Sequence, residues 1–512
     1  MHELPCKPLK NGLLEQEKRV GDAKMRAVVV MYDTLNRRFL PPYGGDWVKA
    51  PNFERLAAHA LTFDCAYAGS LPTLPCRREW HTGRYNFLHR RWGPVEAFDD
   101  SMPEILRESG VWTHLATDGY HYFEDGGSTY HNRYRSWEFF RGQEGDLWHA
   151  DLTVKFPGDL ARKNRNGEQD WINRQYTREE QDWPQYGTFS AAERFLRTNA
   201  KEDDWLLHAE TFDPHEPYFA PQKYRDLYPH DYDGPLDDWP AYRRCEDAPP
   251  ELIEHYRCEH AALTSMCDAS LGRVLDLFDE LDLWKDTLLI VTTDHGFLLG
   301  EHGWTGKMVM PDYDEVARIP LFIWDPRSGR KGERCSQLVQ TIDFAPTVLE
   351  FFGKEIPADM RGVVLKDTIA ADSPARAAGL FGTHGGHVSV TDGRYVYMRA
   401  PQNENSGPLF NYTLTSTNMK GWLSAQGFEQ AEVAGPFGFT KGMRLLKLPA
   451  RERWGSPPEY GNLLFDTETD PAQEKPFSDP EIEKRLIGEM VRLMTEHEAP
   501  PEQYERLGLD EG

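Results

Sequence analysis

The sequence predicts an α/β fold with a mostly parallel central sheet flanked by helices, followed by a smaller C-terminal antiparallel α+β subdomain. Short apolar runs rich in Val, Leu and Ile alternate with helical patterns, which is typical of strand–helix–strand units. Polar motifs follow several of these runs directly, as they do where ligands gather at the carboxyl ends of parallel strands. Beyond about residue 376 the pattern changes to short alternating segments such as TDGRYVYMRA.

The first element is the run RAVVVM, whose continuous apolar character indicates a strand buried on both faces. In chain order, strands are predicted at 26–31, 111–117, 205–210, 287–293 and 320–326. Helices are predicted at 51–60, 77–82, 102–109, 257–281, after Asp343, and at 480–497. The regular alternation of the two sets indicates a parallel, helix-covered sheet.

A length of 512 residues allows two domains. The polar residues 1–24 form an N-terminal extension, and residues 25–375 form the main α/β domain. Within it, residues 124–190 are rich in Gly, Trp, Asp and Arg without periodicity, so we expect an insertion that shapes a substrate pocket. Residues 376–512 form the C-terminal subdomain.

The net charge of -25 argues against nucleic acid or an anionic membrane as the main partner. No run approaches membrane-spanning length, and the N-terminus is not an apolar signal segment, so we expect a cytoplasmic protein. Seven cysteines without paired spacing argue against a disulfide framework. Homo-oligomerisation through the extension or the C-terminal subdomain stays open.

The most specific motif is AYAGSLPTLPCRREWHTGR at residues 66–84. It resembles the active-site signature of the sulfatase branch of the alkaline phosphatase superfamily, in which Ala-Tyr leads into Cys-x-Pro-Ser-Arg and Thr-Gly-Arg follows. Pro75 and Arg77 match, so the cysteine position of the family falls on Thr73, and Cys76 is three residues out of register. The resemblance covers about residues 25–500 and implies an alkaline phosphatase-like fold.

Thr73 changes the chemistry that the resemblance implies. Sulfatases oxidise the cysteine, or a serine, to formylglycine, a route that threonine lacks, so no formylglycine is expected. A threonine hydroxyl attacks as an alkoxide made by a metal or a base, and branches of the superfamily open such phosphoryl esters at phosphorus. Oxidation of Cys76 is the alternative, but the residues after it are Arg77 and Arg78, and no proline stands two positions on.

A metal site is predicted from Asp33, Thr73, Asp294 and His295. The segment DHGFLLGEHG at residues 294–303 resembles the Asp-His-Gly and Gly-Glu-His-Gly motif that supplies metal ligands in the family. Where the family often has a second adjacent acid, this chain has Thr34, and one carboxylate fewer beside a histidine favours Mn or Zn over Ca. The alternative is that Asp33 and Asp294 only cap local structure.

Two cations are candidates for binding the oxyanion. Arg77 offers paired donors that would brace the nucleophile or the departing oxyanion, and a structural salt bridge is its alternative role. Lys307, twelve residues after His295, matches the family lysine that contacts a substrate oxygen. Both side chains would supply local positive charge in an acidic protein.

Two histidines are candidate proton donors. His215, in FDPHEPY, resembles the family histidine that donates to the ester or leaving oxygen, and a loop anchor is its alternative role. Where the family carries Lys-x-His, this chain has DGYH, so His121 is a candidate general acid and Asp118 would orient it at the substrate. The alternative is that His121 packs within its aromatic run.

His384 and His387, in GTHGGH, are predicted to contact substrate. A second metal bound by one of them together with Asp213 is the other reading, since two metals can clamp the entering and leaving oxygens.

The sequence therefore predicts a metal-dependent hydrolase that cleaves a phosphoester or phosphonate ester through Thr73, acting on a small-molecule or saccharide ester. The first alternative is a sulfate-ester hydrolase, as the resemblance implies. The second is a non-catalytic oxyanion-binding protein.

Overall fold

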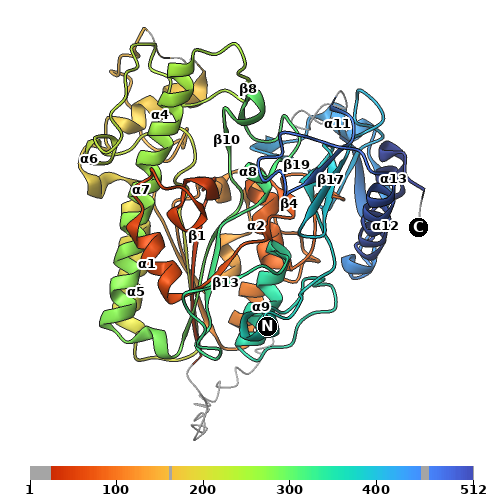
Figure 1. Cartoon of the computed structure of the whole chain (residues 1–512), viewed down its shortest axis with the longest axis horizontal. Helices are drawn as coiled ribbons and strands as arrows, with labels where there is room; N and C mark the ends of the chain where they lie inside the picture. Colours follow the sequence, from red (N-terminus) through yellow and green to blue (C-terminus); the bar gives the residue numbers. More distant parts are fainter. Residues whose placement is uncertain (1–24, 159, 161–163, 451–459, 511–512) are drawn as a thin grey trace, which may run out of the picture.

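A computed structural model describes residues 25–158, 160, 164–450 and 460–510, so the predicted extension at 1–24 lies outside the described residues. Its main feature is an eight-stranded sheet in the order β13-β2-β12-β9-β1-β7-β5-β6 (Figure 1). The strands are β1 (Arg26–Tyr32), β2 (Leu61–Phe63), β5 (Trp112–Thr117), β6 (Ser136–Phe139), β7 (Trp205–Glu210), β9 (Thr287–Thr293), β12 (Leu321–Trp324) and β13 (Glu333–Cys335). Because β12 alone runs antiparallel to its neighbours, the predicted mostly parallel sheet is confirmed.

Strand β1 is buried on both faces, which explains its uninterrupted apolar run. Val28 and Val30 belong to one core cluster, whose helices are α1 (Pro51–His59), α5 (Pro184–Asn199) and α7 (Pro250–Glu280). Val29 and Met31 belong to the opposite cluster, whose helices are α2 (Thr73–Thr82), α3 (Met102–Glu108) and α9 (Phe344–Phe351). Figure 1 shows α1, α5 and α7 to the left of the sheet and α2 and α9 to its right. Each buried valine contributes about 1.5–3 kcal/mol.

The register of the parallel strands brings their carboxyl ends to one edge. Tyr32 at the end of β1 lies beside Thr293 at the end of β9, so Asp33 and Asp294 emerge next to each other. Strand β7, on the other side of β1, ends at Glu210. Three acidic side chains therefore start from this edge, where α/β sheets bind ligands.

A second sheet has five strands in the order β23-β17-β16-β15-β4. Its strands are β4 (Ser70–Leu71), β15 (Gly379–Thr383), β16 (Val388–Thr391), β17 (Tyr395–Arg399) and β23 (Leu463–Asp466). The four C-terminal strands pair antiparallel, and helix α12 (Pro480–Glu496) lies beside them, as predicted. Strand β4 pairs with β15 and ends two residues before Thr73, so this sheet holds the loop that carries Thr73.

Some elements differ from their prediction. The predicted insertion contains β6, which extends the central sheet beside β5, and helix α4 (Arg165–Arg174). Strand β6 is a half-exposed edge strand of mixed polarity, so no regular alternation marks it. The long helix begins at Pro250 rather than at 257, because Pro250 occupies the first helical turn, where it is tolerated.

The six described cysteines are buried and free, so the expected lack of a disulfide framework is confirmed for this part of the chain. No helix within the described ranges combines the length and the apolar composition that a membrane crossing requires.

Candidate active site

Asp33, Asp294 and His295 converge at the carboxyl edge of the central sheet, as the sequence predicts. One ligand atom from each lies within 4.8 Å of the others, and all three side chains are fully buried. His295 donates from Nδ1 to the carbonyl of Gly296 over 2.9 Å, so its Nε2 presents a lone pair. That nitrogen faces Asp294 at 3.5 Å and Asp33 at 4.0 Å.

Thr73 joins this group. Its Oγ1 lies 3.4 Å from His295 Nε2. Thr73 is also the first residue of α2, where free backbone N–H groups and the helix dipole favour an anion. Cys76 lies one turn further along α2, is 1% exposed and does not line the cavity that Thr73 faces.

Arg77 is surrounded by carboxylates. Its guanidinium lies 2.5 Å from Asp294, 2.8 Å from Glu210 and 3.0 Å from Asp33. Its Nη1 also donates to the backbone carbonyl of Thr73 over 3.1 Å. Arg77 therefore braces the nucleophile loop and the acidic cluster, and it also lines a small pocket together with Thr73.

Glu210 is a site residue that the sequence analysis missed. It accepts from Arg77 and, over 2.6 Å, from the Tyr122 hydroxyl. Its position in the sequence could have indicated this role. Glu210 ends a predicted parallel strand, and Asp33 and Asp294 follow the ends of two others. It carried no family motif, so the strand-end position was the only indication.

Lys307 lines the cavity, as expected for a substrate-binding cation. Its Nζ donates to Thr34 Oγ1 over 2.8 Å and lies 3.9 Å from Asp33. The Thr34 hydroxyl in turn donates to Asp33 over 2.7 Å. The neutral hydroxyl of Thr34 therefore lies beside Lys307, at the position where the family often has a second acid.

These side chains fit a divalent cation. Burial, with Asp294 beside it, raises the pKa of Asp33 to about 8. Asp33 Oδ2 is buried and accepts no hydrogen bond, and the charged group beside it is Arg77 at 3.0 Å. Two carboxylates and an imidazole lone pair are a donor set for a divalent cation, whose charge would restore the ionised form of Asp33. With Asp33 ionised, the three acids carry one charge more than Arg77 and Lys307 offset.

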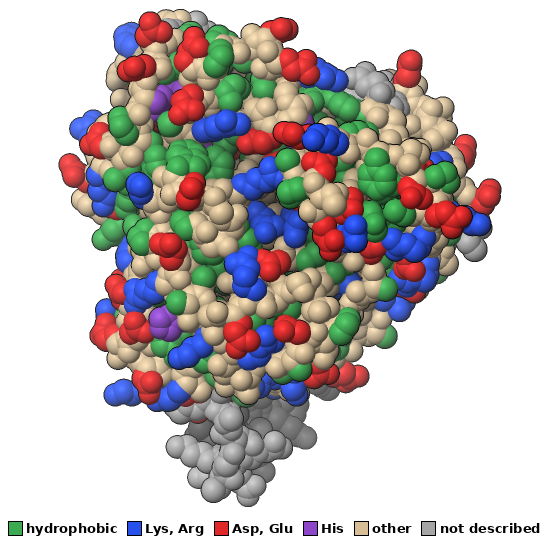
Figure 2. Space-filling view, viewed as in Figure 1, with side chains coloured by type: hydrophobic (Ala, Val, Ile, Leu, Met, Phe, Trp, Pro, Cys, Tyr) green, Lys and Arg blue, Asp and Glu red, His purple; other side chains and the backbone are tan. Residues whose placement is uncertain are grey.

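A cavity of about 590 Å³ opens in front of Thr73 and Lys307. Its remaining lining residues are Pro72, Trp92, His121, Glu144, Asn164, Asn166, His215, Glu216, Asp237, Trp239, Pro240, Ala241, Tyr242, Arg243, Met308, Met419 and Lys420. The predicted insertion thus contributes a glutamate and two asparagines to the wall. Figure 2 shows Lys and Arg side chains gathered near the middle of this face, although the protein is acidic overall.

His215 lines the cavity, where its predicted role requires it to be. Its Nδ1 donates to the backbone carbonyl of Glu216, which leaves a lone pair on Nε2. Burial and the charge of Lys307 hold the pKa of His215 well below its usual value, which favours the neutral ring.

His121 lies where both of its predicted roles require it to be. It lines the cavity, and its ring lies 4.9 Å from Trp92 and 5.7 Å from Phe212. Glu124, not Asp118, orients it, because Nδ1 lies 2.8 Å from Glu124 Oε2.

Asp118 does not reach the cavity wall, so the structure does not bring it to a substrate. It accepts from Gln143 over 2.9 Å and from the backbone N–H of Phe212 over 2.8 Å. Gln143 also donates to Asp213 over 3.0 Å, and burial raises the pKa of Asp118 to about 7. Asp118 is thus a buried partner of Asp213 that follows a strand end without facing substrate.

His384 and His387 are likewise not at the cavity. His384 donates to the carbonyl of Phe87 over 2.7 Å, and His387 donates to that of Gly461 over 3.0 Å. Within the described ranges, neither they nor Asp213 belong to a group of ligands close enough to hold a metal. These histidines anchor the turn between β15 and β16, and the predicted second metal has no such site there.

The fold and this site together define an ester hydrolase. The sequence model of the sulfatase family matches residues 26–354, so the chain belongs to the sulfatase family and is a sulfatase-like ester hydrolase. An N-acetylglucosamine-6-O-sulfatase of Bacteroides thetaiotaomicron is 23% identical over 67% of this chain and 70% of its own length. An arylsulfatase of Clostridium perfringens is 23% identical over 68% of this chain and 78% of its own length.

Solved structures show the same fold. One, in complex with its substrate D-glucosamine-2-N,6-O-disulfate, has a TM-score of 0.66 and 14% identity, and the match covers 94% of this chain and 99% of that one. The phosphonate monoester hydrolase of Agrobacterium radiobacter has a TM-score of 0.64 and 17% identity, and the match covers 93% of this chain and 96% of that one.

Proposed function

We propose that this enzyme hydrolyses a sulfate ester of a saccharide or a similarly sized alcohol. One observation carries the proposal: the Thr73 oxygen lies beside the ligand group of Asp33, Asp294 and His295, and Thr73 lines a cavity together with Lys307. Relatives that are sulfatases support sulfur over phosphorus, which reverses the preference drawn from the sequence. The preference rested on Thr73 alone, whereas the relatives match most of the chain.

A divalent cation held by Asp33, Asp294 and His295 would supply Lewis-acid charge to the ester oxygens. The histidine nitrogen and the neutral Thr34 favour Mn or Zn over Ca in this proposal. Lys307, which lines the cavity, places a further positive charge where sulfate oxygens would bind. The local charge therefore attracts an anionic ester despite the acidic surface.

Thr73 is the proposed nucleophile. Its oxygen attacks sulfur, the bond from sulfur to the ester oxygen breaks, and the alcohol leaves with a proton. Water then attacks sulfur, releases hydrogen sulfate and returns the threonine hydroxyl, so one ester and one water give one alcohol and one hydrogen sulfate. The N-terminus of α2 stabilises the negative charge on the bound group in both steps.

The two cavity histidines take different parts in this scheme. His121, oriented by Glu124, is the proposed donor to the leaving alcohol. His215, neutral with a free lone pair on Nε2, is the proposed acceptor for the proton of the attacking water. This division follows from their hydrogen bonds, because one ring bonds a carboxylate and the other a backbone carbonyl.

The cavity suits a saccharide. Its volume of about 590 Å³ is within the range of small-molecule sites. Trp92 and Trp239 offer apolar ring faces, and Asn164 and Asn166 offer amides to hydroxyl groups. Four tryptophans of the predicted insertion do not line it: Trp137, Trp148, Trp171 and Trp183.

A phosphoester or phosphonate ester is the second candidate substrate. The observation that favours it is Thr73 itself, because a threonine has no aldehyde route for expelling sulfate, and water opens phosphoryl-threonine esters at phosphorus. The phosphonate monoester hydrolase among the structural neighbours has this fold.

Parallel assays with a sulfate ester, a phosphate monoester and a phosphonate monoester of 4-nitrophenol test the proposal on the Mn- and Zn-loaded enzyme. We expect sulfate turnover that Thr73→Ala abolishes. Turnover of the phosphorus esters alone would replace the proposal with the second candidate. Binding of sulfate without turnover above Thr73→Ala would indicate a non-catalytic oxyanion-binding protein.

Peptide mapping of the same preparation tests the nucleophile separately. We expect unmodified Thr73 and an unmodified thiol at Cys76, and full activity in Cys76→Ala. An aldehyde at Cys76 together with an inactive Cys76→Ala variant would contradict the threonine mechanism.

A further inference from the structure

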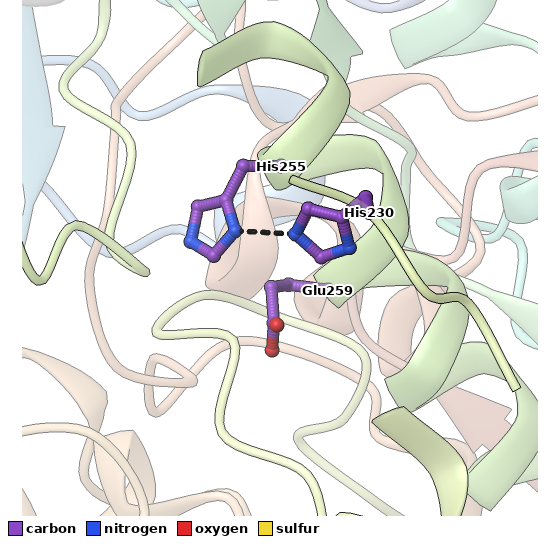
Figure 3. A group of neighbouring side chains, drawn as sticks. All are labelled: His230, His255 and Glu259. Carbon is purple, nitrogen blue, oxygen red and sulfur yellow. Dashed lines mark hydrogen bonds between the residues drawn. The ribbon is translucent and has the colours of Figure 1, made fainter. Parts of the chain in front are cut away.

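Three metal-ligand side chains converge on the outer side of the long helix α7, apart from the active site (Figure 3). His255 and Glu259 are four residues apart on α7, so they project from the same face of the helix. His230 comes from the segment that follows α6 (Gln222–Arg225). One ligand atom of each residue lies within 4.8 Å of the others.

The two rings bring their ligand atoms together. His230 Nε2 lies 2.7 Å from His255 Nδ1. His230 also donates from Nδ1 to the carbonyl of Tyr228 over 2.9 Å, so its Nε2 keeps a lone pair that points at the other ring. Either a ring hydrogen of His255 or a metal ion can therefore join the two nitrogens.

Glu259 has capacity for a metal. Its carboxylate accepts from Arg225, through Oε1 at 2.8 and 3.0 Å and through Oε2 at 3.0 Å. A carboxylate has about four lone-pair positions, so Oε2 keeps one for a ligand bond. Arg225 then acts as the outer partner that orients a ligating carboxylate, and the carbonyl of Tyr228 does the same for His230.

We propose that His230, His255 and Glu259 bind a structural divalent transition metal, for which Zn²⁺ is the best match. Two imidazole nitrogens and one carboxylate oxygen are common zinc ligands, and water would complete the tetrahedron. Bond lengths of about 2.0–2.1 Å would separate the two nitrogens by about 3.3 Å. The half-buried His230 is on a loop and can move outward by the required fraction of an ångström.

The site fastens part of the cavity wall to α7. The segment between His230 and α7 supplies Asp237, Trp239, Tyr242 and Arg243 to the cavity of about 590 Å³. Tyr256, next to His255, also donates to Asp237 over 2.7 Å. Bound metal would therefore hold the segment against the helix and maintain the shape of the wall.

The test uses the full chain with the active-site ligands removed. In Asp33→Asn/Asp294→Asn protein freed of metal by a chelator, we expect one equivalent of Co²⁺ to bind with the visible absorption of a tetrahedral site, and Zn²⁺ to displace it. Adding His230→Gln is expected to lower the affinity for Co²⁺ at least about 100-fold. Loss of a residue that only orients a ligand typically costs 10–100-fold, and His230 is a ligand itself. His59→Gln, at another half-buried histidine, is the matched control and should leave binding unchanged.

Thermal unfolding gives a second readout that does not depend on activity. Zn²⁺ should raise the Tm of the same background and should have no effect after His230→Gln, which replaces a loop residue and spares α7. Zinc-edge anomalous diffraction should place one ion between His230 and His255. If the background protein binds no Co²⁺ or Zn²⁺, or if His230→Gln binds as tightly, only a proton joins the rings and the proposal is overturned.

Discussion

Thr73 Oγ1 lies 3.4 Å from His295 Nε2, although 222 residues separate them in the chain. Thr73 is the first residue of α2, and His295 follows the end of β9. The contact therefore joins the start of this helix to the end of this strand. It places an unmodified hydroxyl in the position that the active-site signature gives to cysteine. The predictions below concern this hydroxyl and the charges around it.

Removal of the Thr73 hydroxyl should abolish chemistry without unfolding the protein. Thr73→Ala is expected to lower kcat/KM at least about 1,000-fold, as losses of nucleophiles do. Thr73→Ser keeps the hydroxyl and should retain activity within about tenfold. Equal Tm values for the three proteins, measured by thermal unfolding, serve as the control. Comparable activity in wild type and Thr73→Ala would rule out Thr73 as nucleophile.

Arg77 should be a major contributor to stability. Arg77→Met leaves Asp33, Asp294 and Glu210 buried without their shared cation, which should cost about 3–5 kcal/mol in metal-free protein. Arg55→Met is the control, since Arg55 forms surface pairs with Asp276 and Asp279 that are worth under about 1 kcal/mol. Denaturant unfolding measures both changes. Similar losses for the two variants would show that the buried pairs are not stabilising.

Thr34→Asp should change metal preference. It places a second carboxylate beside Asp33 and Lys307, and oxygen-rich, more negative sites favour Ca²⁺. The φ of Thr34 is 66°, a left-handed conformation that aspartate adopts more readily than threonine. Calorimetric titration should show tighter Ca²⁺ binding in the variant, with Thr34→Ser as the control. An unchanged order of affinities would show that residue 34 does not set selectivity.

Glu79 should make stability depend on pH. Burial raises its pKa to about 8, despite hydrogen bonds from Ser70 and Thr341 that favour ionisation. The folded protein therefore holds a proton that the unfolded chain releases near its ordinary pKa of 4.5. This contribution is complete below pH 4.5 and is lost as the pH rises through about 8, by up to about 1.4 kcal/mol per pH unit.

Denaturant unfolding of wild type and Glu79→Gln at several pH values measures that effect. The stability difference should shift in favour of the variant as the pH rises across this window, because glutamine stays neutral. Parallel pH profiles for the two proteins would mean that Glu79 has an ordinary pKa in the fold.

The order of strands and helices could be predicted because β1, β7 and β9 are buried on both faces and read as continuous apolar runs. Thr73, Asp294 and His295 could be predicted because two local motifs carry them, and Asp33 because it follows the end of a buried strand. Asp118, His384 and His387 were misplaced at the substrate, because a strand-end or loop position does not say which way a side chain points. Glu210 had no motif and was missed.

Local sequence thus determined the strands, the register of the Thr73 loop and the candidate metal ligands, since an apolar run or a motif of neighbouring residues marks each of them. Only the tertiary structure decided that Arg77 is shared by three acids, that Glu124 orients His121, and that His215 donates to a backbone carbonyl. It also brought His230 to His255 and Glu259. Hydrogen-bond direction and burial depend on groups from distant segments, and those meet only once the chain has folded.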